Sequence, residues 1–140
     1  MASVSRLYLD TSAYLALLLG ESRSELIQRE ISGSRILSSV LLVLEARRTL
    51  VRLAREGSLS ASGLTAILAR IETDLDAFIL RELTLDLCGI KPVPLVVTPR
   101  SLDLAHLRTA AWFHETEPIT RFVSLDVSQN SAARELGLPV

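Results

Sequence analysis

The sequence contains one cysteine, one lysine and no long apolar run, and each shortage excludes a class of protein. Cys88 has no second cysteine to pair with, so the chain lacks an internal disulfide framework, which agrees with a reducing compartment. No apolar run approaches the roughly 18 residues that a membrane-spanning helix needs. The early cation Arg6 precedes an apolar run that Asp10 interrupts, unlike the core of a secretory signal. We therefore expect a cytoplasmic protein that makes no membrane contact.

The composition indicates one globular domain spanning residues 1–140. Hydrophobic residues make up 49% and charged residues 22%, with a mean hydropathy of +0.35, so the chain can bury a sizeable core. No internal repeat, low-complexity tract or linker divides it. The apolar surplus also leaves residues for an interface with a partner.

The net charge of −1 gives no electrostatic reason to expect nucleic acid. However, every cation except Lys91 is an arginine, and Arg47, Arg48, Arg52 and Arg55 lie within nine residues. Arginine binds phosphate through two parallel hydrogen bonds, which points toward a phosphate-bearing partner. For most of these arginines a solvated helix face is the better explanation.

The spacing of apolar residues predicts strands that alternate with helices. Expected strands cover residues 7–9, 35–38, 77–80 and 122–125, with a short fifth strand at 138–140. Expected helices cover residues 13–19, 21–31, 40–56, 64–75, 102–113 and 130–136, the first capped by Thr11 and Ser12 and the fifth by Ser101. Residues 83–97 are expected to form a buried, irregular connection, because Gly89, Pro92 and Pro94 interrupt both regular patterns. This alternation predicts an α/β fold, with a mainly parallel sheet of four to five strands covered by helices on both faces.

Four acidic residues occupy positions where an unpaired charge is costly. Asp10 and Asp126 each terminate a predicted strand, and the carboxyl ends of parallel strands lie at one edge, where ligands bind. Glu45 follows the apolar run 40–44 on a helix that must be largely buried, and Asp103 lies in the first turn of its helix. Carboxylates that meet in one crevice repel one another unless a cation lies between them.

An all-oxygen set of ligands, without cysteine or a histidine pair, suits Mg²⁺ or Mn²⁺ and disfavours zinc. The chemistry expected of such a site is phosphodiester hydrolysis, in which the ion polarises the phosphoryl group and activates water. Thr11 and Ser12 are placed to orient a water molecule or a ligating carboxylate.

Each acid also has a purely structural interpretation. Asp103 favours a helix N-terminus through the helix dipole, Asp126 can cap the closing helix, and Glu45 can pair with Arg48 or Thr49. Asp10 is the hardest to explain in this way, because Thr11 and Ser12 could cap its helix without it.

Three other reactive residues are given structural roles. We expect His106 to be packed or hydrogen-bonded rather than a base, and His114 to lie at the surface. Cys88 is expected to be a buried small hydrophobe.

Four segments, each holding one of these acids, extend over nearly the whole chain. They are YLDTSAYLALLLGE at residues 8–21, SSVLLVLEARRTL at 38–50, SLDLAHLRTA at 101–110 and FVSLDVSQNSAARELGLPV at 122–140. In these segments and their order the chain resembles PIN domains, specifically the VapC-type toxins of prokaryotic toxin–antitoxin pairs.

The resemblance implies a three-layer, Rossmann-like fold and a magnesium- or manganese-dependent endoribonuclease. It also implies a homodimer that is held inactive by a small antitoxin, whose tail lies across the active site. Ser12 matches a small hydroxyl residue that lines the family's site, and Ser124 stands where the family often has threonine. The acidic metal site that the resemblance implies consists of Asp10, Glu45, Asp103 and Asp126.

The leading hypothesis is therefore a metal-dependent ribonuclease toxin, with Arg48, Arg100 and Arg108 steering RNA into the crevice. One rival is a signalling domain with Asp10 as phosphate acceptor, although no second aspartate lies two residues on and Lys91 falls in the irregular stretch. Another rival is a catalytically silent PIN-like interaction module.

Overall fold

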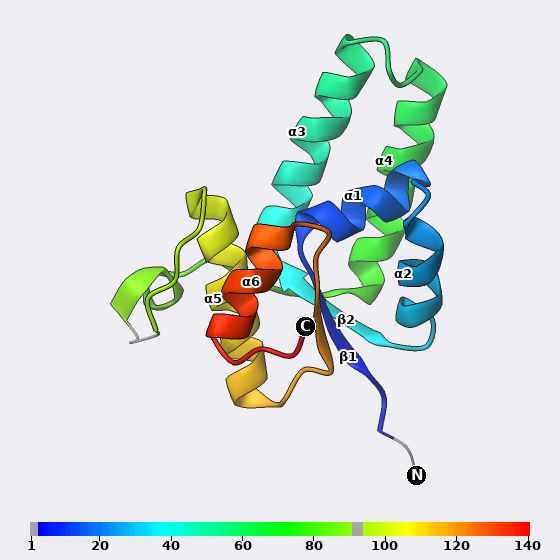
Figure 1. The fold of residues 1–140 in the computed structure, drawn as a ribbon. Helices are drawn as coiled ribbons and strands as arrows, with labels where there is room; N and C mark the ends of the chain where they lie inside the picture. The colour runs from blue at the N-terminus through cyan, green and yellow to red at the C-terminus, as the bar shows by residue number, and fades with distance from the viewer. Residues whose placement is uncertain (1–2, 91–93) are drawn as a thin grey trace.

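In the computed structural model, which describes residues 3–90 and 94–140, helices cover both faces of a parallel sheet (Figure 1). The strands lie in the order β3-β2-β1-β4: β1 (Arg6–Leu9), β2 (Arg35–Ser39), β3 (Ile79–Arg81) and β4 (Arg121–Val123). The helices are α1 (Thr11–Leu19), α2 (Ser24–Ile31), α3 (Leu41–Arg55), α4 (Ala61–Ala77), the π-helix η1 (Asp86–Ile90), α5 (Ser101–Thr116) and α6 (Val127–Glu135). The predicted α/β fold with a parallel sheet is confirmed, and its three layers are Rossmann-like.

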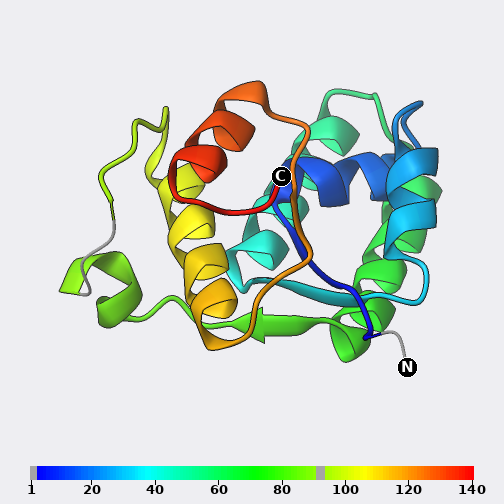
Figure 2. The same ribbon diagram turned by 60° about the horizontal axis from the view of Figure 1, so that its bottom comes forward.

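Side chains of the central strand β1 alternate between two cores, as a strand buried on both faces requires. Leu7 and Leu9 pack with residues of α1, α2, α3 and α4, whereas Tyr8 packs with residues of α5 and α6. Figure 2 shows α5 and α6, yellow to red, on one side of the sheet and the earlier helices on the other. The alternating pattern in the first strand thus fixes which helices share a layer.

The strand β1 pairs with β2 on one side and with β4 on the other, all in parallel. Tyr8 lies opposite Phe122, and their rings stack with centroids 5.5 Å apart. The Asp10 backbone N–H donates to the Val123 carbonyl at 3.1 Å, which extends this pairing by one residue. Residues that follow β1, β2 and β4 consequently gather at one edge of the sheet.

Several predicted boundaries were wrong near the site. The first helix begins at Thr11, and Asp10, not Thr11 or Ser12, is its N-cap. Ser101 is the first residue of α5 rather than its cap, and β4 ends at Val123, three residues before Asp126. The short apolar runs were enough to predict the strands. Where a helix begins, however, several neighbouring polar residues can each cap it, so the sequence did not determine which one does.

Residues 138–140 do not form the predicted fifth strand. The Pro139 carbonyl accepts a hydrogen bond from the Phe122 backbone N–H at 2.7 Å, and Leu138 is buried beside α5 and α6. One proline-interrupted contact is too short to build a ladder.

The prediction of a buried connection over residues 83–97 was also wrong. Leu85 is 74% exposed and Cys88 is exposed, whereas Leu87 is buried. The short helix η1 lies beside α5 in Figure 1, and among its residues Leu87 is buried while Cys88 is exposed. Lys91 and Pro92 lie outside the described residues. Within the described part of the chain, no helix is both long and apolar enough to cross a bilayer.

Candidate functional site

Asp10 lies at the junction of β1 and α1, buried to 5% exposure. Its backbone is extended (φ −83°, ψ 174°), which lets its carboxylate Oδ1 accept from the Ala13 N–H at 3.1 Å and from the Ser12 hydroxyl at 2.7 Å. Burial raises the pKa of Asp10, and the hydrogen bonds from Ser124, Ser12 and Ala13 only partly offset this. The folded protein therefore holds a poorly solvated carboxylate at this edge of the sheet.

Two serine hydroxyls join this corner to the loop after β4. The Ser12 Oγ accepts from the Leu125 N–H at 3.0 Å and lies 3.3 Å from the Ser124 Oγ, which accepts from the Asp126 N–H at 3.0 Å. Asp126 in turn caps α6 through the Gln129 N–H at 3.0 Å. Its structural role as a cap is thus real, and the serines tie it to the Asp10 corner.

Glu45 reaches the same edge from α3. Its Oε1 accepts from the Thr11 hydroxyl at 3.0 Å and lies 2.8 Å from the His106 Nε2, so neither Arg48 nor Thr49 is its partner. Burial tends to raise the pKa of Glu45, but the hydrogen bond and charge of His106, the Thr11 hydroxyl and the charge of Arg100 lower it overall. Glu45 is therefore held as a carboxylate.

Asp103 projects from the first turn of α5 and forms a two-pronged ion pair with Arg100. The Arg100 Nε lies 3.2 Å from one carboxylate oxygen and its Nη2 lies 3.2 Å from the other. Hydrogen bonding to Asp103 raises the pKa of Arg100, and the charges of Asp103, Glu45 and Asp126 also raise it. One guanidinium therefore interacts electrostatically with three of the four predicted acids.

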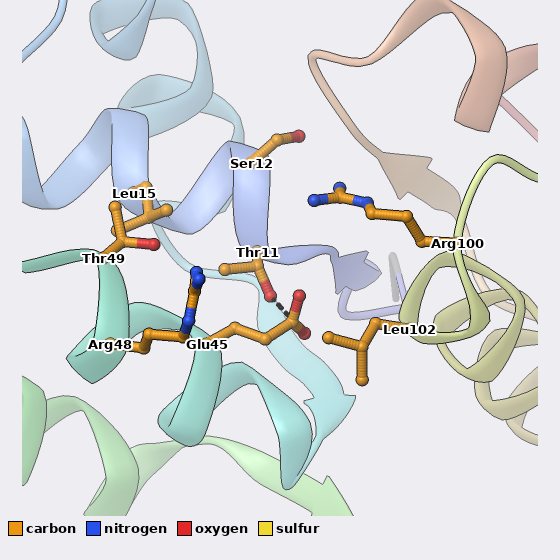
Figure 3. Close-up of a pocket in the computed structure, with 8 residues that line it drawn as sticks. All are labelled: Thr11, Ser12, Leu15, Glu45, Arg48, Thr49, Arg100 and Leu102. Carbon is orange, nitrogen blue, oxygen red and sulfur yellow. Dashed lines mark hydrogen bonds between the residues drawn. The ribbon is translucent and has the colours of Figure 1, made fainter. Parts of the chain in front are cut away.

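A hollow of about 410 Å³ opens between α1, α3 and the start of α5, and of the four predicted acids Glu45 alone is among its lining residues (Figure 3). Figure 3 shows Arg48 and Arg100 entering it from different sides, with the Glu45 carboxylate between them. Arg108 instead donates to the Leu87 carbonyl and lines a separate hollow beside η1. The lining of the larger hollow consists of Thr11, Ser12, Leu15, Glu45, Arg48, Thr49, Arg100 and Leu102.

The acids of residues 3–90 and 94–140 do not form a ready-made metal site, because no three side chains among histidine, cysteine, aspartate and glutamate there are arranged to hold an ion. Each predicted acid is already engaged by an N–H, a hydroxyl or a guanidinium. The donor set nevertheless fits a hard cation in its chemistry, since all four side chains offer oxygen and Arg100 already serves three of them as counter-charge.

Sequence reasoning missed three supporting residues. His106 and Tyr8 form a hydrogen-bond chain to Glu45, and the buried Gln129 donates its Nε2 to the Asp103 carbonyl at 2.9 Å. His106 was correctly predicted to be hydrogen-bonded, but its partner was not identified. A usable signal existed, because His106 lies three residues after Asp103 and shares its helix face. His114, predicted at the surface, is half-buried, and its Nδ1 accepts from the Ile119 N–H at 3.1 Å.

Compared with protein-family models and with curated proteins, the chain matches none. What it does is therefore inferred from its own residues.

Proposed function

We propose that this chain is a Mg²⁺- or Mn²⁺-dependent endoribonuclease of the PIN-domain type, acting as a VapC-like toxin. The observation that carries the proposal is the gathering of carboxylates from separate segments around one arginine at the carboxyl edge of a parallel sheet. Carboxylates that are kept ionised or desolvated in a common crevice are typical of functional sites. Asp10, Glu45, Asp103 and Asp126 are the proposed ligands.

The cation would supply Lewis acidity toward the phosphoryl group and would make water a better nucleophile. The side chains of the chain perform the remaining tasks. Ser12 fixes the Asp10 carboxylate by donating to it, and Thr11 does the same for Glu45. Arg100 holds Asp103 in this structure, and its guanidinium would become available for phosphate if a cation took its place at that carboxylate.

Arg48 completes the proposed contact to RNA. It lines the same hollow as Arg100 but on α3, so two guanidinium groups flank the space in which a phosphate would lie. Leu15 and Leu102 supply apolar lining between them. Arg108 is the weaker candidate, because it lines the hollow beside η1 instead.

The proposal includes two protein partners that the resemblance implies, a second copy of the chain and an antitoxin. Exposed apolar side chains on α2 and α3, namely Leu26, Leu44 and Val51, offer surface for such contacts. The cytoplasm is the expected location of the proposed ribonuclease.

Cleavage of RNA during a Mn²⁺ titration tests the proposal. We expect Asp10→Asn to lower the cleavage rate about a hundredfold or more, because a lost ligand costs several kcal/mol of transition-state stabilisation. Asparagine caps a helix as well as aspartate does, so the variant should keep its fold. Asp76→Asn, at an exposed position of α4, is the matched control and should cleave as wild type does. Equal rates for wild type and Asp10→Asn would refute the proposal.

The two rivals make different predictions. A silent interaction module predicts no heat of Mn²⁺ binding in calorimetry, whereas the ribonuclease proposal requires such binding. The aspartyl-phosphate hypothesis requires an accessible acceptor, whereas the Asp10 Oδ1 already accepts two hydrogen bonds and is buried. Stable incorporation of phosphate at Asp10 would restore that hypothesis.

A further inference from the structure

A chain of buried hydrogen bonds leads from the sheet to Glu45. The Tyr8 hydroxyl of β1 lies 2.8 Å from the Nδ1 of His106 on α5, and the Nε2 of His106 lies 2.8 Å from the Glu45 Oε1 on α3. The Thr11 hydroxyl lies 3.1 Å from the same Nε2 and donates to the same Oε1. Three elements from different parts of the chain therefore meet at one carboxylate oxygen.

The chemistry of the partners assigns the protons. A carboxylate only accepts, so the His106 Nε2 must carry the hydrogen that bonds Glu45. The other ring nitrogen, Nδ1, is held by the Tyr8 hydroxyl at 2.8 Å. Burial raises the pKa of Tyr8 well above its ordinary value, which keeps the hydroxyl proton on the tyrosine. The two contacts, one at each ring nitrogen, thus fix the orientation of the His106 ring.

The chain of hydrogen bonds ends inside the protein and cannot carry protons to solvent. Tyr8 is 0% exposed, and its ring stacks on Phe122 and touches Phe113. A relay would need an outlet at both ends, whereas the hydroxyls beside Tyr8, those of Ser38 and Thr109, are themselves fully buried. Its effect is therefore on the position of Glu45.

Both donors use the same oxygen of Glu45. Thr11 and His106 bond Oε1, while Oε2 has no hydrogen-bond partner among residues 3–90 and 94–140. Figure 3 shows this second oxygen on the side that faces the space between Ser12 and Arg100. One oxygen is saturated by the protein and the other is left for a ligand in the hollow.

We propose that His106, oriented by Tyr8, is a positioning residue that saturates Oε1 of Glu45 and presents Oε2 to a divalent cation in the hollow. This inference rests on the proposed function, since it assumes that Glu45 binds a metal ion. Partners behind a ligating side chain orient it, and their loss typically lowers metal affinity about 10- to 100-fold.

Two amide substitutions separate the two sides of the imidazole. Gln places its side-chain nitrogen near the former Nε2, so His106→Gln can still donate to Glu45. Asn is shorter and reaches only toward the former Nδ1, so His106→Asn loses that donor while remaining a buried amide of similar polarity. The pair therefore differs in the one contact that matters here.

Calorimetric titration with MnCl₂ of the full chain measures the effect without relying on cleavage. We expect His106→Gln to bind Mn²⁺ within about threefold of wild type and His106→Asn to bind it about 10- to 100-fold more weakly. In the Glu45→Gln background, the same His106→Asn substitution should cause no further loss, because the group that it positions is already changed. Thermal unfolding of both His106 variants controls for a general loss of packing.

The outcomes distinguish this inference from the proposed function. Wild-type binding of Mn²⁺ together with unchanged affinity in His106→Asn overturns the positioning role and leaves the ribonuclease proposal intact. Equal weakening by His106→Gln and His106→Asn also overturns it, because rescue by the conservative variant is its signature. Failure of wild type to bind Mn²⁺ overturns both.

Discussion

Arg100 and a divalent cation should compete for Asp103. The guanidinium makes two hydrogen bonds of 3.2 Å to that carboxylate, and it also interacts with Glu45 and Asp126. Replacing Arg100 by alanine removes the internal competitor without removing a helix cap, because the Arg100 side chain makes no capping bond to α5. We therefore expect Arg100→Ala to bind Mn²⁺ more tightly than wild type.

The structure limits the size of this effect. The Arg100 side chain is 69% exposed, so the ion pair is largely screened by water and contributes about 0.2–1 kcal/mol. This free energy corresponds to a dissociation constant for Mn²⁺ that is lowered roughly 1.4- to 5-fold. The metal-free variant should lose a similar amount of its free energy of unfolding, since the same contact is absent there.

Calorimetry with MnCl₂ and urea unfolding in EDTA measure the two quantities independently. Arg48→Ala is the matched control, because it removes an arginine from the same hollow without breaking the contact with Asp103. It reports the long-range effect of charge alone, and the gain in Arg100→Ala should exceed it. Unchanged or weaker Mn²⁺ binding by Arg100→Ala would refute the competition, provided that wild type binds the ion.

Two further predictions concern stability. Burial raises the folded-state pKa of Asp10, so the stabilisation from its protonated form is complete below the unfolded pKa and is lost as pH rises through the folded pKa. Asp10→Asn should therefore increase the free energy of unfolding in EDTA near pH 7, by about 1.4 kcal/mol for each pKa unit by which folding raises the pKa of Asp10. The gain should vanish below about pH 3.9, where the carboxyl is protonated in both states. Urea melts that show Asp10→Asn destabilised at neutral pH would contradict this. Leu107 is fully buried against the sheet, so Leu107→Ala should lower the free energy of unfolding by about 2–5 kcal/mol in a urea melt. Leu85→Ala, at an exposed position, should change it by less than about 0.5 kcal/mol. Comparable losses in the two variants would refute the assigned core.

The arrangement of layers was predictable because short apolar runs and helical periodicity carry it directly. The apolar run of β1 is followed at once by a charged residue, and this pattern alone was enough to predict Asp10 at the carboxyl edge of the sheet. Its role as a helix cap was not predictable, because Thr11 and Ser12 are equally good caps in isolation and only the backbone angles decide. Local pattern thus specifies where an element ends but not which of several polar neighbours satisfies its first N–H groups.

The contacts that define the site depend on how helices are set against one another. Glu45 and His106 are 61 residues apart, and although His106 shares a helix face with Asp103, neither helix alone indicates that His106 reaches Glu45. The exposure of Cys88 was missed because cysteine is usually buried in proteins, whereas the helix η1, which carries Cys88, leaves this side chain exposed. Pairings of this kind require the register between elements, which a single sequence does not contain.

The pairing of β1 with β4 has a consequence during synthesis. Leu7 lies opposite Arg121, so the edge of β1 that pairs with β4 can be covered only after nearly all of the polypeptide has been synthesised. Contacts between such distant residues form late and slowly. A polypeptide truncated before Ser124 would lack the hydroxyl that joins the Asp10 corner to the loop after β4, so the edge of the sheet that carries Asp10 is completed only when the last quarter of the chain has been made.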